Sequence, residues 1–164
     1  MQRRSFLTQT AVVAGAATLG APALAQTQPT IRWRCVSSFP KNIDILYGCA
    51  EVMSKAVAEI TDNKFQIQVF AAGDIVPALQ AFDAASNNTV EMCHSASYYY
   101  TGKDPAFAFG THAPFLLNTR QQTAWAYHGE GKKLLEDFYR GHNVVALPGG
   151  NTTTQMGGWF RREV

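Results

Sequence analysis

The 164-residue sequence contains only three cysteines, and no two of them form a CxxC pair. A sparse, odd-numbered set provides no disulfide framework and no thiolate metal site. We therefore expect Cys35, Cys49 and Cys93 to behave as small apolar residues.

Familiar catalytic and nucleotide-binding motifs are also missing. The sequence has no GxSxG, GxGxxG or P-loop pattern, and its histidines lack the HExxH spacing of a zinc site. We interpret the four histidines as surface or capping residues: His94, His112, His128 and His142. No nucleophile and base are paired in the sequence, so we predict that the protein is not an enzyme.

Clusters of basic residues are absent as well. The chain has 14 Lys and Arg residues against 12 Asp and Glu residues, but Arg3 and Arg4 lie in a segment that reads as a removable signal. Without those two, twelve basic residues balance twelve acidic ones, so the expected net charge is zero. A neutral chain without Lys/Arg runs argues against a nucleic-acid partner.

Residues 1–25 have the character of an export signal. Arg3 and Arg4 precede an uncharged stretch rich in Ala, Gly and Thr, which ends on the small-x-small pattern Ala23-Leu24-Ala25. The arginine pair is typical of the twin-arginine route. A membrane anchor is the alternative, but a span needs about 20 strongly apolar residues. We predict a periplasmic location after cleavage near Ala25.

The sequence does contain an alternation of strand and helix patterns. Period-two alternation predicts strands over 31–38 and 64–70, and two further short strands are predicted over 89–96 and 143–149. Helical patterns occupy 42–60, 77–85 and 119–139, the last one bent or split near Gly129 and Gly131. Because each helix is long enough for a crossover, we predict an α/β fold with an open parallel sheet.

The helix predicted over 42–60 has the spacing of an amphipathic helix, in which one apolar stripe faces the core. Its apolar positions are Ile45, Leu46, Cys49, Val52, Met53, Ala56, Val57 and Ile60. The pair Asp62-Asn63 is predicted to stop the helix.

Ligands of open parallel sheets lie beyond the carboxyl ends of the strands. The residues there carry hydroxyl, phenol, amide and imidazole groups: Ser37, Ser38, His94, Ser95, Ser97, Tyr98, Tyr99, Tyr100, Asn151 and Gln155. Such groups suit a small polar molecule, because they offer donors, acceptors and apolar walls with polar tips. Two structural alternatives remain open: the tyrosines form a packed edge, or residues 151–155 form an ordinary polar turn.

Several of these stretches occur together in one known family. With the arginine-pair signal, "RWRCVSSFPK", "YYYTGKDP" and "GNTTTQMGGWFRREV" closely resemble the solute-binding subunits of tripartite ATP-independent periplasmic (TRAP) transporters, especially receptors for 2-oxo acids such as pyruvate. The resemblance implies a periplasmic-binding-protein-like, two-lobed fold. Residues 26–164 would form the first lobe and the start of the crossover, truncated before most of the second lobe.

The resemblance also implies roles for individual residues. Gln155 would help to hold a metal cation, sodium in the 2-oxo acid receptors, that bridges to the substrate carboxylate. Tyr99, Tyr100 and Asn151 would contact or adjoin the substrate. The arginine that pairs with the carboxylate in such receptors would lie beyond Val164.

The implied partners are a small organic acid and the sodium-driven TRAP membrane subunits, with a homodimer left open for the full-length protein. Two alternatives accompany this interpretation. The receptor would take lactate, a polyol, a dicarboxylate or a sulfonate, or the chain would be a twin-arginine-exported enzyme with a cofactor.

Overall fold

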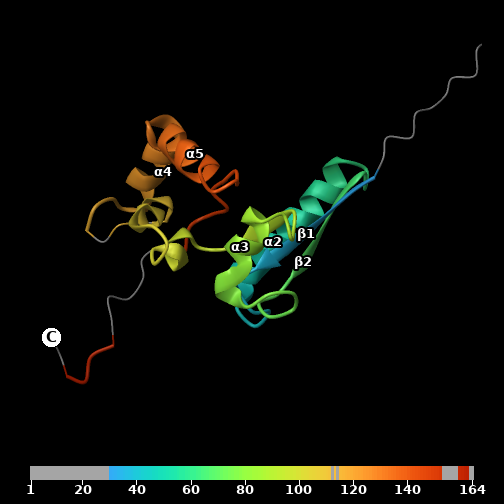
Figure 1. Ribbon diagram of the computed structural model, residues 1–164, viewed down its shortest axis with the longest axis horizontal. Coiled ribbons are helices and arrows are strands. Elements are labelled where there is room, and N and C mark those ends of the chain that lie inside the picture. Colours follow the sequence, from blue (N-terminus) through green and yellow to red (C-terminus); the bar gives the residue numbers. More distant parts are fainter. Residues whose placement is uncertain (1–29, 112, 114, 153–158, 163–164) are drawn as a thin grey trace, which may run out of the picture.

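The computed structural model describes residues 30–111, 113, 115–152 and 159–162 (Figure 1). The predicted export signal over 1–25 and Gln155 lie outside these residues. No helix in the described part of the chain is long and apolar enough to cross a membrane.

A three-stranded sheet is the centre of the first half of the chain. Its strands are β1 (Ile31–Ser37), β2 (Phe65–Phe70) and β3 (Met92–His94), in the order β2-β1-β3. Both outer strands run parallel to β1, which confirms the predicted parallel pairing. The third strand is shorter than the predicted range 89–96.

Two crossovers join the strands. Helix α2 (Asp44–Ile60) connects β1 to β2 and packs against β2, beside which Figure 1 shows it. The second crossover contains the 3-10 turn η2 (Ala78–Gln80) and helix α3 (Ala81–Ser86). Val36, Ala81, Ala84 and Val90 form the small core beneath α3.

The end of α2 follows the sequence prediction. Asp62 and Asn63 adopt positive φ angles of 49° and 59°, a region that Asn and Asp tolerate better than most residues. The Asn63 backbone N–H donates to the Ala58 carbonyl at 2.8 Å. The Thr61 hydroxyl donates to the Val57 carbonyl at 2.7 Å. These contacts satisfy carbonyl groups that a helix end leaves without partners.

The orientation of α2 differs from the prediction. Its buried residues are Tyr47 and Ala50, whereas Ile45 and Ile60 each expose 81% and Val52 exposes 71%. Only part of the predicted apolar stripe therefore faces the sheet. The spacing of apolar residues could not orient the helix because α2 is apolar on more than one side.

The second half of the chain is mainly helical. The 3-10 segments η3 (Ser97–Tyr100) and η4 (Pro105–Gly110) lead to α4 (Thr119–His128) and α5 (Gly131–Arg140). A capping box between Asn118 and Gln121 begins α4. The break between α4 and α5 confirms the predicted split near Gly129 and Gly131.

An aromatic cluster joins this helical group to helix α3, the second crossover of the sheet. Phe82 of α3 meets Phe107 with ring centroids 5.1 Å apart and Tyr139 of α5 at 6.5 Å. Tyr100 completes the buried set. Elements that look separate in Figure 1 are thus connected through a shared core.

The predicted fourth strand is not formed. Residues 144–149 run without regular structure, although their side chains alternate as a strand's do. Val144 and Ala146 pack against the aromatic cluster, while Val145 and Leu147 are more than four-fifths exposed. The prediction was wrong because alternation determines which face a residue occupies, whereas a strand also requires a neighbouring backbone to pair with.

Candidate functional site

The carboxyl ends of β1 and β3 meet at one edge of the sheet. The Ser38 backbone N–H donates to the His94 carbonyl at 2.8 Å, so Ser37-Ser38 lies beside His94-Ser95. The predicted gathering of hydroxyl-bearing residues at this edge is therefore present.

Residues 98–100 of η3, three tyrosines, form what we call the tyrosine turn. A chain of hydroxyl groups connects this turn to the ends of β1 and β3. The Phe82 backbone N–H donates to Tyr100 Oη at 3.2 Å, and Tyr100 Oη lies 2.8 Å from Ser95 Oγ. Ser95 Oγ and Ser38 Oγ are 2.7 Å apart, and Ser38 Oγ donates to the Ala78 carbonyl at 2.7 Å.

Because that carbonyl can only accept, a consistent arrangement has every donor pointing from Phe82 towards Ala78. The Tyr100 ring is buried, with 4% exposure. Its hydroxyl thus connects η3 and α3 with Ser38 and Ser95, the residues that directly follow β1 and β3, at the edge where a ligand is expected.

His94 occupies a more enclosed place than the sequence indicated. Its Nδ1 lies 3.2 Å from Ser37 Oγ, which also accepts from the Phe39 backbone N–H at 3.1 Å. Ser37 Oγ can donate to an unprotonated Nδ1 or accept from an Nδ1–H, so the contact fits either tautomer of neutral His94. Burial lowers the pKa of His94. The prediction of a surface or capping histidine was wrong for this residue because the short strand β3 carries it into the sheet edge.

Tyr99 is the half-buried member of the tyrosine turn. Its ring lies 6.1 Å from that of Phe39 and 4.7 Å from that of Tyr98, measured between centroids. Burial, followed by a hydrogen bond with Tyr98, raises the pKa of Tyr99 to about 12. Its phenol therefore stays protonated at neutral pH and is a neutral hydrogen-bond donor.

The other predicted site residues come from the end of the chain. Asn151 is exposed, and its Oδ1 accepts from Thr119 Oγ1 at 3.4 Å, which places it near the start of α4. The structure brings Tyr99 and Tyr100 together in η3. Gln155, predicted as both a substrate and a metal ligand, lies outside the described residues. Among the described residues, no group of three or more His, Cys, Asp or Glu side chains is placed to hold a metal.

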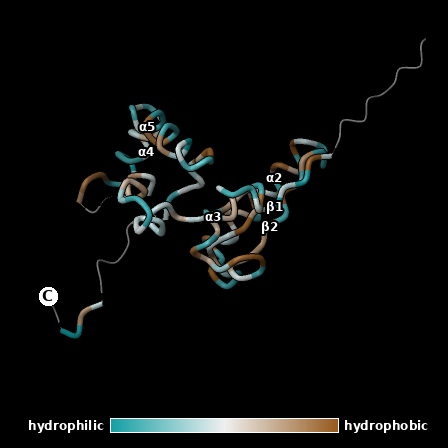
Figure 2. The backbone as a smooth tube through the Cα atoms, in the orientation of Figure 1, coloured by the Kyte–Doolittle hydropathy of each residue, from teal (hydrophilic) through white to brown (hydrophobic). Residues whose placement is uncertain are grey.

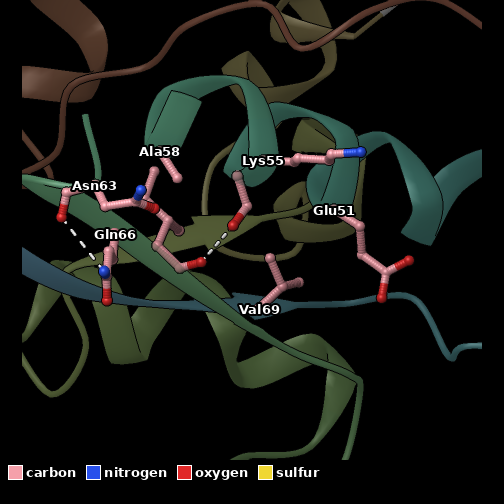
Figure 3. A pocket seen from close by; sticks show the side chains of 8 residues that line it. Glu51, Lys55, Ala58, Asn63, Gln66 and Val69 are labelled. Atoms are coloured by element: carbon pink, nitrogen blue, oxygen red, sulfur yellow. Dashed lines mark hydrogen bonds between the residues drawn. The ribbon is translucent and has the colours of Figure 1, made fainter. Parts of the chain in front are cut away.

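A hollow of about 330 Å³ lies elsewhere, between α2 and β2 (Figure 3). The Ser54 hydroxyl donates to the Ile67 carbonyl across it, and Gln66 donates to the Asn63 carbonyl at 3.3 Å. In Figure 3 the Glu51 carboxylate and the Lys55 ammonium point in different directions. These groups do not converge on a common point. The hollow is therefore a gap between α2 and β2 and not a second ligand-binding site.

Sequence reasoning identified the residue types at the sheet edge but missed how they are connected. The link from Tyr100 to Ser38 spans 62 positions, and no local pattern reports it. The available signal was the parallel pairing of β1 with β3. Their register aligns Ser37 with His94, so the residues that follow, Ser38 and Ser95, also lie close together.

A parallel α/β sheet with donors and acceptors at its carboxyl edge has the arrangement in which open sheets bind small ligands. The family described as "Bacterial extracellular solute-binding protein, family 7" matches residues 36–164. The chain therefore belongs to this family. Its description is that of solute-binding proteins and not of enzymes, which confirms that expectation.

Curated and solved relatives agree with this assignment. The chain is 43% identical to a monocarboxylate 2-oxoacid-binding periplasmic protein of Nostoc, over all of this chain and 46% of the relative. It is 45% identical to a TRAP transporter solute-binding protein of Bordetella bronchiseptica solved with calcium and picolinate, with a TM-score of 0.79 over 82% of this chain and 40% of the other.

A second solved relative, from Pseudoalteromonas atlantica, holds sodium and pyruvate. It is 38% identical, with a TM-score of 0.79 over 82% of this chain and 41% of that protein. These structures confirm the predicted α/β, periplasmic-binding-protein-like fold class. The chain spans less than half the length of the relatives it matches.

Proposed function

We propose that this chain is the first lobe of a periplasmic TRAP solute receptor that captures a 2-oxo acid such as pyruvate. Solved relatives at 38% and 34% identity hold pyruvate together with a cation, and this supports the proposal most directly. The predicted export signal over 1–25, with cleavage near Ala25, would deliver the receptor to the periplasm. The TRAP membrane subunits would be its partners, with a homodimer left open.

In this proposal the substrate lies beyond the carboxyl ends of β1 and β3. Tyr99 supplies a neutral phenol and an apolar wall, and the adjacent Tyr100, held by its hydroxyl network, completes this side of the site. Asn151 offers an amide donor and acceptor. Gln155 contributes an amide oxygen to a cation, which offsets the charge of the substrate carboxylate.

Sodium is the cation we propose, although relatives have been solved with sodium or with calcium. An amide oxygen is a hard ligand and suits either ion. The proposal commits to a carboxylate bound through the ion, so the affinity for pyruvate should depend on which cation is present.

The test is calorimetry on the full-length protein, titrated with pyruvate in sodium, calcium and cation-depleted buffers. We expect binding that weakens at least tenfold without the cation and on Gln155→Ala. Gln122→Ala on α4 is the matched control and should bind as the unmodified protein does. Cation-independent binding would contradict the bridging ion, and tighter binding of an uncharged polyol than of pyruvate would contradict the substrate class.

A further inference from the structure

Tyr99 packs against two clusters of buried residues. One is the aromatic cluster described above, and the other consists of Phe39, Tyr47 and Ala71. In Figure 2 the backbone that leads from the sheet to the helical group is mostly pale, the colour of intermediate hydropathy, in keeping with the serines and tyrosines of residues 95–100. A phenol ring in such a place can be covered on one side and open to a ligand on another.

Phe39 is the buried residue behind Tyr99. The centroids of the two rings are 6.1 Å apart, and Phe39 retains only 6% exposure. Because Phe39 occupies this side of Tyr99, a substrate would meet the phenol ring on another side. The Phe39 ring therefore limits how far the Tyr99 wall can move away from a substrate.

Hydrogen bonds hold the backbone of Phe39 on both sides. Its N–H donates to Ser37 Oγ at 3.1 Å, and its carbonyl accepts from the Ala72 backbone N–H at 3.2 Å. These bonds tie Phe39 to the end of β1 and to the loop that follows β2. The orientation of its ring is then left to the side chains that contact it.

His94 contacts the Phe39 ring from β3. The two ring centroids are 5.2 Å apart and the ring planes meet at 64°, an edge-to-face arrangement that aromatic rings favour. His94 Nδ1 lies 3.2 Å from Ser37 Oγ, the same hydroxyl that accepts from the Phe39 backbone. His94, Phe39 and Tyr99 thus form three rings in successive contact, which we name the ring series.

We propose that Phe39 is a positioning residue for substrate selection, which holds the Tyr99 ring in place and is itself held by His94. This inference rests on the proposed function, in which Tyr99 forms one wall of a site for a 2-oxo acid. A fixed wall fits a small acid closely, whereas a wall that can recede leaves a gap beside it. A longer acid recovers the contacts that such a gap loses. The ring series therefore favours pyruvate over 2-oxo acids with a longer side chain.

Calorimetry on the full-length protein tests this role, with pyruvate and 2-oxobutyrate, which has one more methylene, as the two ligands in sodium buffer. Phe39→Leu keeps an apolar side chain but removes the ring. We expect the Kd for pyruvate to rise at least tenfold and that for 2-oxobutyrate at most threefold. Phe65→Leu is the matched control, because Phe65 begins β2 at the opposite end of the sheet and pairs with Trp33 at 4.9 Å. It should leave the ratio of the two Kd values within a factor of two.

Two variants of His94 provide a second test that leaves Phe39 unchanged. His94→Asn keeps a polar group for Ser37 but has no ring, and it should shift the ratio at least threefold in the same direction as Phe39→Leu. His94→Phe keeps a ring against Phe39 and should leave the ratio within a factor of two. Circular dichroism checks that each variant is folded.

The outcomes separate this inference from the proposed function. Equal weakening of both acids by Phe39→Leu would contradict the positioning role, because a purely structural residue affects both ligands alike. An unchanged ratio in His94→Asn would also contradict it. Either result with tight pyruvate binding by the unmodified protein leaves the proposed function standing. If the unmodified protein binds neither acid, the proposed function fails and the inference fails with it.

Discussion

At the scale of single residues, the Tyr100 hydroxyl has the most connections at the sheet edge. It accepts from the Phe82 backbone N–H and lies within hydrogen-bond distance of Ser95 and Ser38. Removing it with Tyr100→Phe leaves a buried N–H without an acceptor, so we expect a loss of about 1–3 kcal/mol in the free energy of unfolding. Urea denaturation measures this value.

The matched control for that substitution is Tyr127→Phe, because Tyr127 is 54% exposed. It should shift the free energy of unfolding by no more than about 0.5 kcal/mol. If Tyr100→Phe is as mild as the control, the hydroxyl network does not hold the edge together. The position of Tyr99 would then not depend on the hydrogen bonds of the Tyr100 hydroxyl.

At the scale of elements, the turn between α4 and α5 depends on the absence of a side chain at Gly131. A Cβ there would lie 2.5 Å from Trp125 Cδ2 and 2.7 Å from the Trp125 carbonyl oxygen. Rotation of the indole cannot relieve the backbone contact. We expect Gly131→Ala to destabilise the protein by about 1–3 kcal/mol, the usual range for overpacking, with a change in tryptophan emission.

Gly102→Ala is the control for this substitution, because nothing lies within 4 Å of the added Cβ. Urea denaturation of both variants measures the difference. Equal stabilities would mean that the two helices are free to separate at the turn. The aromatic cluster around Phe107 would then hold α5 in place without help from the turn.

Elements whose signals are local were predictable from the sequence. Alternation in 64–70, the stop at Asp62-Asn63 and the glycines between α4 and α5 each act within a few residues, and the structure confirms them. Orientation and pairing depend on partners far along the chain. The exposed side of α2 and the unpaired segment 144–149 were mispredicted for that reason, and the hydroxyl network at the sheet edge was missed for the same one.

At the scale of the whole molecule, α3, η3, η4 and α5 share the aromatic cluster, so Tyr99 is packed in the same core as α5. That arrangement supplies hydroxyl, phenol and amide groups from one side of the proposed substrate. Binding proteins of this fold class trap ligands by closing two lobes around them. A single lobe therefore makes only part of the contacts.

The chain of residues 26–164 should bind pyruvate at least a hundredfold more weakly than the full-length protein. Loss of charge-assisted contacts costs on the order of 1.5–3 kcal/mol each, and about 2.7 kcal/mol already corresponds to a hundredfold change in Kd. Calorimetry of both proteins in sodium buffer measures the ratio, with circular dichroism as the check that the shorter chain is folded. Affinities within a factor of ten would contradict a site shared between two lobes, because one folded lobe would then supply nearly all of the binding energy.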